Sequence, residues 1–152
     1  MLQRILLSCV LALGMLGCGT APPAPTVPTV EGETIDFNQL RGKWVVLNYW
    51  ASWCRPCYQE IPALNALAHE HADQVVVLGV SFDQVASTQA LIPIIQQLGI
   101  EFPILAINPA AQLGISSIPA LPATFIFDPQ GHQVAQLFGE QTQESLLAVV
   151  QK

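Results

Sequence analysis

Two almost continuous hydrophobic segments, with an amphipathic segment between them, most constrain the fold of this chain. Residues 43–50 and 74–81 are rich in β-branched or aromatic residues, as expected for strands buried on both faces of a sheet. Between them, residues 56–71 place apolar side chains at helical spacing. Strand, helix and strand in this order form a βαβ unit, which implies parallel strands and a right-handed crossover.

The rest of the chain carries signals for a mixed sheet flanked by helices. Ser87 can cap a helix that Gly99 ends, and Pro93 should kink or shorten that helix. The sequence Asp-Pro-Gln-Gly at 128–131 predicts the turn of an antiparallel hairpin. The further expected elements are a helix at 87–98, strands at 102–107, 123–127 and 133–138, and a helix at 142–150. We therefore expect one α/β domain without an internal repeat.

Residues 1–17 resemble a secretory signal peptide. Arg4 precedes an apolar run at 5–16, which is shorter than the about 20 residues that cross a bilayer as a helix. Gly17 before Cys18 resembles the lipobox of bacterial lipoproteins, in which the signal is removed and the cysteine is lipidated. An ordinary cleaved signal with an incidental cysteine is the alternative. The interpretation predicts an extracytoplasmic or periplasmic protein of the cell envelope, attached to a membrane through lipid on Cys18.

The segment at 18–29 is rich in proline, which removes backbone donors and favours an extended polyproline II conformation. We interpret it as a semi-rigid tether between the lipidated cysteine and a domain at 30–152. A leftover linker without a role is the alternative. Charge does not supply the attachment, because five basic residues against eleven acidic ones disfavour binding to anionic lipid and to nucleic acid alike.

The four cysteines reduce to one candidate redox pair. Cys9 lies within the predicted signal, and Cys18 would be bonded to lipid. Cys54 and Cys57 remain, three positions apart, between the first strand and its helix. A framework that staples a small secreted domain would need several bridges.

The sequence Trp53-Cys54-Arg55-Pro56-Cys57 therefore lies at a predicted helix N-terminus. Free N–H groups and the helix dipole stabilise a thiolate there, and Arg55 adds a positive charge nearby. The first cysteine in this spacing is usually the exposed one, which makes Cys54 the nucleophile and Cys57 the resolving thiol. Pro56 loses no hydrogen bond at the helix start and stiffens the turn.

Three other roles are possible for a CxxC pair. A structural zinc site needs two further ligands, and His69 and His71 are two positions apart, on different sides of their helix. A structural disulfide closing so short a loop contributes little stability. Haem attachment needs a histidine after the second cysteine, where this chain has Tyr58. We expect no metal, and no cofactor beyond the Cys54–Cys57 disulfide itself.

Two blocks of sequence are specific enough to carry a resemblance. One is residues 48–57, Asn-Tyr-Trp-Ala-Ser-Trp-Cys-Arg-Pro-Cys, followed by Glu60 and Pro62. The other is residues 121–128, Leu-Pro-Ala-Thr-Phe-Ile-Phe-Asp, followed by Gly131. Together they resemble the thioredoxin superfamily and, within it, the TlpA/ResA-like exported thiol–disulfide oxidoreductases. The resemblance implies the thioredoxin fold, a mixed central sheet flanked by helices, from about residue 29 onward.

The resemblance also implies a substrate-binding site. The Leu121–Pro122 peptide is expected to be cis and to lie opposite the cysteines, where its backbone would bind a substrate strand. Pro119 is the competing position, and Pro62 is expected to kink the active-site helix. The implied substrate-binding residues are Trp53, Arg55, Pro56, Leu121 and Pro122.

The chain differs from thioredoxin at the position of the buried residue that accepts a proton. Thioredoxin itself has a buried aspartate where this chain has Asn48. TlpA-like proteins often carry a carboxylate in the loop after the next strand, and Asp83 is the candidate in this chain. An ordinary loop or helix-capping role is an equal alternative for Asp83.

The implied reaction is dithiol–disulfide exchange, in which Cys54 attacks a substrate disulfide and Cys57 releases the reduced product. The usual direction in TlpA/ResA-like proteins is reduction, for instance of apocytochrome c or other exported thiols, with electrons from a membrane thiol reductant. The alternatives are a dithiol oxidase that donates disulfides to folding proteins and a non-enzymatic module that binds a metal or a peptide. A peroxiredoxin is disfavoured, because its usual Pro, Thr and single-Cys pattern is absent before Cys54.

Overall fold

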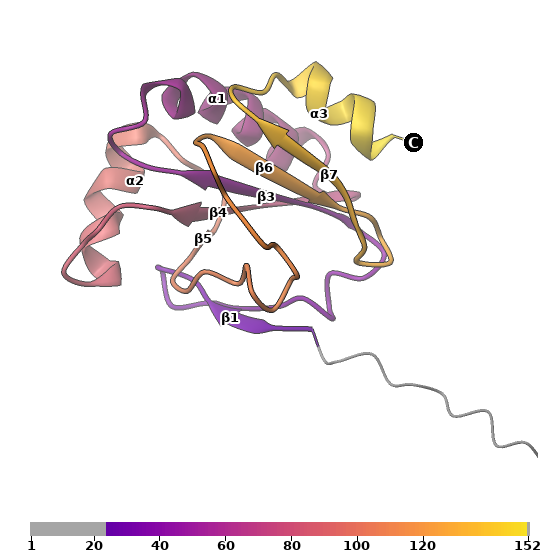
Figure 1. Ribbon diagram of the computed structural model, residues 1–152, viewed down its shortest axis with the longest axis horizontal. Helices are drawn as coiled ribbons and strands as arrows, with labels where there is room; N and C mark the ends of the chain where they lie inside the picture. The colour runs from indigo at the N-terminus through magenta and orange to yellow at the C-terminus, as the bar shows by residue number, and fades with distance from the viewer. Residues whose placement is uncertain (1–23, 152) are drawn as a thin grey trace, which may run out of the picture.

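The computed structural model describes residues 24–151, and in this part of the chain five strands form one mixed sheet (Figure 1). The order of its strands is β5-β4-β3-β6-β7. They are β3 (Trp44–Trp50), β4 (Val75–Ser81), β5 (Ile104–Leu105), β6 (Ala123–Phe127) and β7 (Gln133–Phe138). A separate antiparallel ribbon consists of β1 (Thr26–Pro28) and β2 (Thr34–Asp36). The helices are α1 (Arg55–Glu70), the 3₁₀ helix η1 (Thr88–Leu91), α2 (Ile92–Leu98) and α3 (Gln143–Val150).

The predicted βαβ unit and the predicted hairpin are both confirmed. β3 and β4 pair in parallel, and α1 connects them. β6 pairs antiparallel with β3, and β7 pairs antiparallel with β6. The Asp128 carboxylate closes the hairpin turn by accepting the N–H groups of Gln130 and His132 at 3.0 and 2.8 Å. Gly131 adopts a φ of +80° in this turn, which a glycine tolerates without strain.

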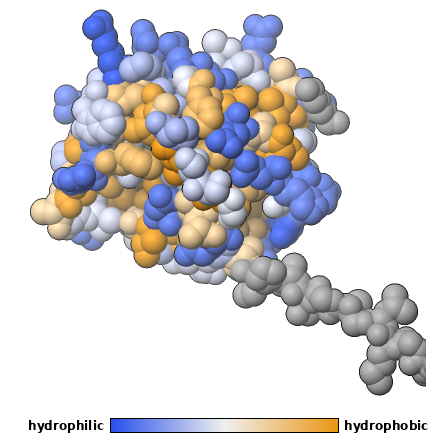
Figure 2. Space-filling model, viewed as in Figure 1, coloured by the Kyte–Doolittle hydropathy of each residue, from blue (hydrophilic) through white to orange (hydrophobic). Residues whose placement is uncertain are grey.

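Two layers cover the sheet. α1 and α3 lie over one face, and the β1–β2 ribbon and the segment 106–122 lie over the other (Figure 1). Because side chains alternate along a strand, Val46 and Trp50 of β3 face α1, whereas Leu47 and Tyr49 face the other layer. Asn48 shares its face with Val46 and Trp50 and is therefore directed at α1. Hydrophilic and hydrophobic residues are interspersed over the face of the domain that Figure 2 shows.

The predicted helix at 87–98 is divided in two. Residues 88–91 form the 3₁₀ helix η1, and α2 begins at Ile92. Pro93 lies in the first turn of α2, where its missing N–H breaks no helical hydrogen bond. Gly99 ends α2 in the left-handed conformation with φ 66°, as the sequence predicts.

The described part of the predicted tether, residues 24–29, packs against the domain. Residues 26–28, assigned to the tether, form β1. The Val27 side chain is buried in the part of the core that lies on the opposite face of the sheet from α1. The chain is also bonded to β5, since the Val30 N–H donates to the Ile104 carbonyl at 2.8 Å. The prolines predict a segment that extends into solvent, but Val27 and Thr29 are buried against the domain. The predicted signal peptide at 1–17 and Cys18 lie outside the described residues.

Between residues 24 and 151, no helix is both long and apolar enough to cross a membrane.

Candidate active site

A disulfide joins Cys54 and Cys57 at the start of α1. The S–S distance is 2.05 Å and the two Cα atoms are 5.4 Å apart. Cys54 is the N-cap residue of α1, and Pro56 lies in its first turn. Cys54 is 5% exposed and Cys57 is 0% exposed, so a partner in solution reaches the Cys54 sulfur first. The free N–H groups of the first turn provide the positive field that favours a thiolate.

The loop before Cys54 is held by Asp83. The two carboxylate oxygens of Asp83 accept the Ser52 N–H at 2.9 and 3.1 Å, the Ser52 hydroxyl at 2.7 Å and the Ser81 hydroxyl at 3.0 Å. The Tyr58 hydroxyl donates to the Ser52 carbonyl from the first turn of α1. These contacts anchor the chain on both sides of Trp53. Asp83 therefore lies at the active-site loop, but its oxygens are already engaged by two serines.

Glu60 is a second carboxyl group at the site, and it is fully buried. It lies three positions after Cys57 on α1, where helical side chains are neighbours. Burial raises the pKa of Glu60 from 4.5 to about 7, although the hydrogen bonds from Asn48 and Gln141 act in the opposite direction. A carboxyl group with a pKa near neutrality can exchange a proton at physiological pH.

Side chains and backbone from three distant segments surround Glu60. The Asn48 amide donates to Glu60 Oε1 at 2.7 Å and to Thr124 Oγ1 at 3.1 Å. The Gln141 N–H donates to Glu60 Oε2 at 3.1 Å. We call Asn48, Glu60 and Thr124, together with the Gln141 N–H, the buried polar cluster. Each carboxylate oxygen of the buried Glu60 thus accepts a hydrogen bond.

The sequence interpretation did not assign Glu60 a chemical role; it used Glu60 only as part of a resemblance. A signal was available, because Glu60 occupies a position between Cys57 and Leu64 on the apolar face of the predicted helix. A carboxylate in such a position needs partners when buried. The identity of those partners depends on β3 and on the loop before α3, which local sequence does not reveal.

The Leu121–Pro122 peptide is cis, as the resemblance implies. Because Ala123 pairs with Tyr49, Pro122 lies level with Trp50, at the end of β3 that leads to Cys54. The Gly139 N–H donates to the Pro122 carbonyl at 2.9 Å. The structure therefore brings the proline loop and the disulfide to the same end of the sheet.

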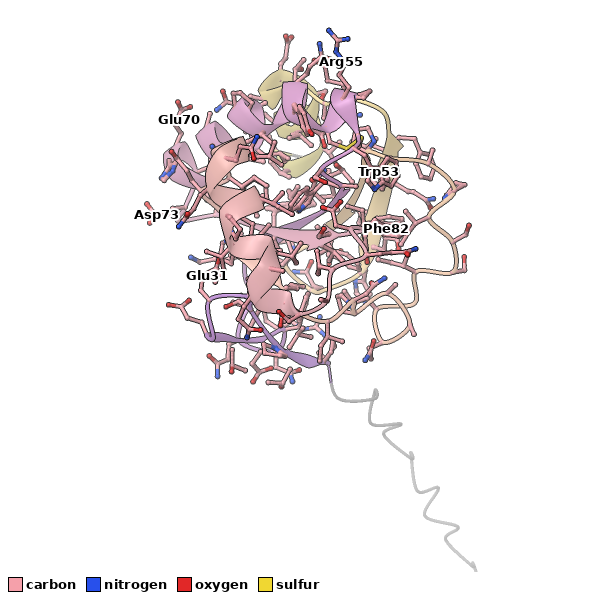
Figure 3. The ribbon with its side chains drawn as sticks, turned by 90° about the vertical axis from the view of Figure 1, so that its left-hand side faces the viewer. Glu31, Trp53, Arg55, Glu70, Asp73 and Phe82 are labelled. Carbon is pink, nitrogen blue, oxygen red and sulfur yellow. A yellow bond between two sulfur atoms is a disulfide. The ribbon has the colours of Figure 1, made fainter. Side chains whose placement is uncertain are left out.

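The other predicted site residues lie around the disulfide and are open to solvent. Trp53 is 69% exposed, and Arg55 and Pro56 are also exposed. Figure 3 shows Arg55 at the top of the molecule and Trp53 below it, toward the right of the view. Among residues 24–151, no group of three or more histidine, cysteine, aspartate or glutamate side chains is arranged to hold a metal ion.

A cysteine pair at a helix N-terminus, beside a cis-proline at the start of the neighbouring antiparallel strand, defines a thiol–disulfide oxidoreductase of the thioredoxin fold. The AhpC/TSA family model matches residues 18–135, and the chain belongs to this family. Within it, the chain is similar to thiol–disulfide oxidoreductase ResA of Bacillus thuringiensis (strain Al Hakam), with 32% identity over 134 residues, covering 88% of this chain and 77% of the relative.

Two further comparisons agree. ResA of Bacillus subtilis (strain 168) is 28% identical over 129 residues, which cover 84% of this chain and 71% of that protein. The crystal structure of StoA from Bacillus subtilis superposes with a TM-score of 0.70 at 25% identity, covering 87% of this chain and 98% of StoA. The fold and the dithiol–disulfide chemistry expected from the sequence are thereby confirmed.

Proposed function

We propose that this oxidoreductase reduces disulfides of exported proteins. The observation that carries the proposal is the Cys54–Cys57 pair at the N-terminus of α1, with the buried Cys57 three positions before Glu60, whose carboxyl group has a pKa of about 7. The accessible sulfur serves the substrate, and the buried sulfur serves only Cys54. This division of roles fits a dithiol that reduces a partner and then forms its own Cys54–Cys57 disulfide.

In the first step, the Cys54 thiolate attacks one sulfur of a substrate disulfide. A mixed disulfide forms between Cys54 and that sulfur, and the other substrate sulfur leaves as a thiolate, which takes up a proton. The positive end of the α1 dipole stabilises the attacking thiolate. Trp53, Arg55 and Pro56 border the attacking Cys54 sulfur and contact the substrate.

In the second step, Cys57 attacks the Cys54 sulfur of the mixed disulfide. The Cys54–Cys57 disulfide forms, and the second substrate sulfur is released as a thiol. Two electrons have then passed from the two cysteines to the substrate. Cys57 must lose a proton in this step, and Glu60 receives it, because Glu60 lies three positions further along α1 and is buried like Cys57. Glu60 is thus proposed as the proton acceptor in place of Asp83, the candidate from the sequence.

The cis peptide supplies the docking element. The Leu121 backbone, directly before Pro122, pairs with an extended substrate segment beside Cys54, because Pro122 has no N–H and its carbonyl already accepts from the Gly139 N–H. Donor and acceptor groups of that backbone would orient the substrate sulfur for in-line attack.

The cellular setting is part of the same proposal. A signal peptide at 1–17 exports the chain, and lipid on Cys18 retains it at a membrane. Exported proteins that carry thiols or disulfides are the substrates, and a membrane thiol reductant returns electrons to Cys54–Cys57 after each turnover.

An insulin-reduction assay on the purified chain tests the mechanism. Wild type should precipitate the insulin B chain, and Cys54→Ser should be inactive. Cys57→Ser should accumulate the mixed disulfide, detected as an added mass on Cys54. Activity that survives Cys54→Ser would refute the assignment of the nucleophile.

The direction of electron flow is tested by the reduction potential. A value near −270 mV, about that of thioredoxin, supports a reductase. A value near −120 mV, about that of the strongest periplasmic oxidants, would instead make the chain a dithiol oxidase.

A further inference from the structure

The two edges of the five-stranded sheet differ in whether the chain covers them. β5 forms one edge, and the N-terminal segment closes it through an antiparallel bridge between Thr29 and Leu105, flanked by two backbone hydrogen bonds of 2.8 Å. β7 forms the other edge (Figure 1). In the part of the chain that the structure describes, no backbone hydrogen bond outside the β6–β7 ladder involves residues 134–138. One edge is therefore closed by the chain itself, and the other is open.

The hydrogen bonds of β7 show which of its backbone groups face the open edge. Successive residues of an antiparallel strand direct their N–H and carbonyl groups alternately toward the neighbouring strand and away from it. The Gly139 N–H donates to the Pro122 carbonyl, so the Gly139 backbone faces β6. In the same alternation the Leu137 backbone faces β6, whereas Gln136 and Phe138 direct their N–H and carbonyl groups outward.

β7 lacks the residues that usually protect an edge strand. Exposed edges are commonly blocked by charged side chains, especially lysine, or by proline. Residues 133–139 read Gln-Val-Ala-Gln-Leu-Phe-Gly and contain neither. A shift of register against β6 lies between Ile126 and Phe127, at the turn end of the hairpin, and the pairing is regular from Ala135 to Phe138. The open edge is thus an uncharged strand that can pair with another strand.

β7 is complementary to a second copy of itself in one antiparallel register. With Gln136 opposite Gln136 of the second copy, their outward N–H and carbonyl groups can form two reciprocal hydrogen bonds. This register places Val134 opposite Phe138, a β-branched and aromatic pair that occurs twice by symmetry. The two side chains are 49% and 44% exposed in the single chain. On the α1 face of the sheet, Ala135 comes to lie opposite Leu137.

Charge complementarity continues the same register beyond the strand. Glu140 of each copy comes to lie opposite His132 of the other, and both residues are exposed. A carboxylate accepts a hydrogen bond from an imidazole N–H, and no like charges face each other between these two positions. A register shifted by two residues in either direction would lose both the Val134–Phe138 pairs and the Glu140–His132 pairs. The sequence therefore favours the register centred on Gln136.

The symmetry of such a pair leaves both redox sites and both N-terminal segments accessible. The two-fold axis is perpendicular to the joined sheet, so each face of the sheet is the same in both copies. The described chain begins at Ala24, which packs on the face that the β1–β2 ribbon covers. Both N-terminal segments then leave from one face and can reach the same membrane. The two disulfides lie at opposite ends of the joined sheet, because the two β7 strands run in opposite directions.

We propose that β7 pairs antiparallel with β7 of a second copy of this chain, about Gln136, and that the two sheets form one continuous sheet. The partner of this surface is thus a second copy of the chain. The inference goes beyond the proposed reduction of exported proteins, because β7 takes no part in the dithiol exchange.

A charge exchange at the symmetry axis tests the proposal. Residue 136 faces itself across the axis, so Gln136→Lys and Gln136→Glu each place two like charges opposite one another, and an equimolar mixture of the two variants places opposite charges there. Gln136→Pro removes the outward N–H without removing a bond to β6, and Gln136→Ala keeps that N–H as the matched control. Sedimentation equilibrium of the purified full chain in a density-matched detergent measures the dimer, and far-UV circular dichroism confirms that each variant is folded.

We expect wild type to be dimeric at about 100 µM, since one pair of strands forms a small interface. Gln136→Lys and Gln136→Glu alone should each weaken the dimer about fivefold or more, and their mixture should return to within about twofold of wild type. Gln136→Pro should weaken it at least about tenfold, while Gln136→Ala stays within about twofold. A wild-type monomer at this concentration, or a mixture no tighter than either charged variant alone, would overturn the proposal. The charged variants decide the result even if Gln136→Pro does not fold.

A photo-crosslink identifies what occupies the edge in cells. Benzoylphenylalanine incorporated at position 136 of the full chain is irradiated in the cells that produce it, and the crosslinked peptides are sequenced by mass spectrometry. A product of twice the mass of the chain, joined to residues 134–138 of the second copy, supports the proposal. A crosslink from this position to a different protein would overturn it, because the edge would then bind another polypeptide.

Discussion

Replacing Glu60 with glutamine should remove a pH-dependent loss of stability. In the folded chain Glu60 is fully buried, and its pKa is raised to about 7, with burial as the largest cause. In the unfolded chain the same group is solvated and has its ordinary pKa of 4.5. Folding therefore favours the protonated form, and stability depends on pH through this one group.

The sign and size of the effect follow from the two pKa values. Below pH 4.5 both states hold the proton, and the group contributes no pH dependence. Between pH 4.5 and about 7 the unfolded chain has released its proton while the folded chain keeps it, so stability falls as the pH rises. Above pH 7 the loss is complete. At about 1.4 kcal/mol for each pKa unit, the difference between the two values corresponds to about 3 kcal/mol.

Urea unfolding of the oxidised chain at several pH values between 4 and 8 measures this loss. We expect the stability of Glu60→Gln relative to wild type to increase by about 3 kcal/mol across this range. A glutamine amide facing the Gln141 N–H or the Asn48 amide adds a penalty, but that penalty does not vary with pH. Glu70→Gln, on the exposed part of the same helix, is the control and should show little change. A Glu60→Gln difference that stays constant with pH would refute the reasoning, because it would mean that the Asn48 and Gln141 donors fully offset burial.

Three further substitutions test the packing around the site. Asp83→Asn places an amide where Ser52 donates, and we expect a loss of about 1–3 kcal/mol in urea unfolding; unchanged stability would contradict an anchoring role. Gly79→Ala brings a Cβ within 2.4 Å of Ile104 Cδ1 in the buried core, so the free energy of unfolding should fall by about 1–3 kcal/mol. Asn48→Asp puts a second carboxylate against the buried glutamate, so one of the two must hold a proton. The pH profile of the second exchange step should then move upward by about one pH unit or more, and an unmoved profile would exclude coupling between the two groups.

Much of the fold could be predicted because its signals are local. Continuous hydrophobicity identified β3 and β4, and the predicted bounds of β6 and β7 agree with the observed ones because the Asp-Pro-Gln-Gly turn separates them. Gly99 marked the end of α2 through its left-handed conformation. Each of these features depends on residues within a few positions of one another, which is the range over which sequence patterns are informative.

The features that were missed depend on contacts between distant segments. β1 has only three residues and is flanked by Pro25 and Thr29, which give no clear strand pattern. Its pairing with β2 is stabilised by the burial of Val27 against the sheet. The buried polar cluster joins Glu60 to residues 12 and 81 positions away. A helical pattern indicates that Glu60 faces the core, but it does not indicate that Asn48 and Gln141 donate hydrogen bonds to its carboxylate.

The burial of Glu60 links the stability of the domain to its chemistry. In the proposed second step Cys57, which is 0% exposed in the disulfide, loses its proton to Glu60, which is buried with it. Burial is also what raises the pKa of Glu60 to about 7 and destabilises the folded chain at higher pH. The same variant should therefore separate the two consequences. At pH 8, Glu60→Gln should be more stable than wild type. It should form the Cys54 mixed disulfide at an unchanged rate but release product from it at least about a hundredfold more slowly. Rapid-quench measurement of the two steps checks this, and a variant that is both more stable and equally fast would show that Cys57 loses its proton by another route.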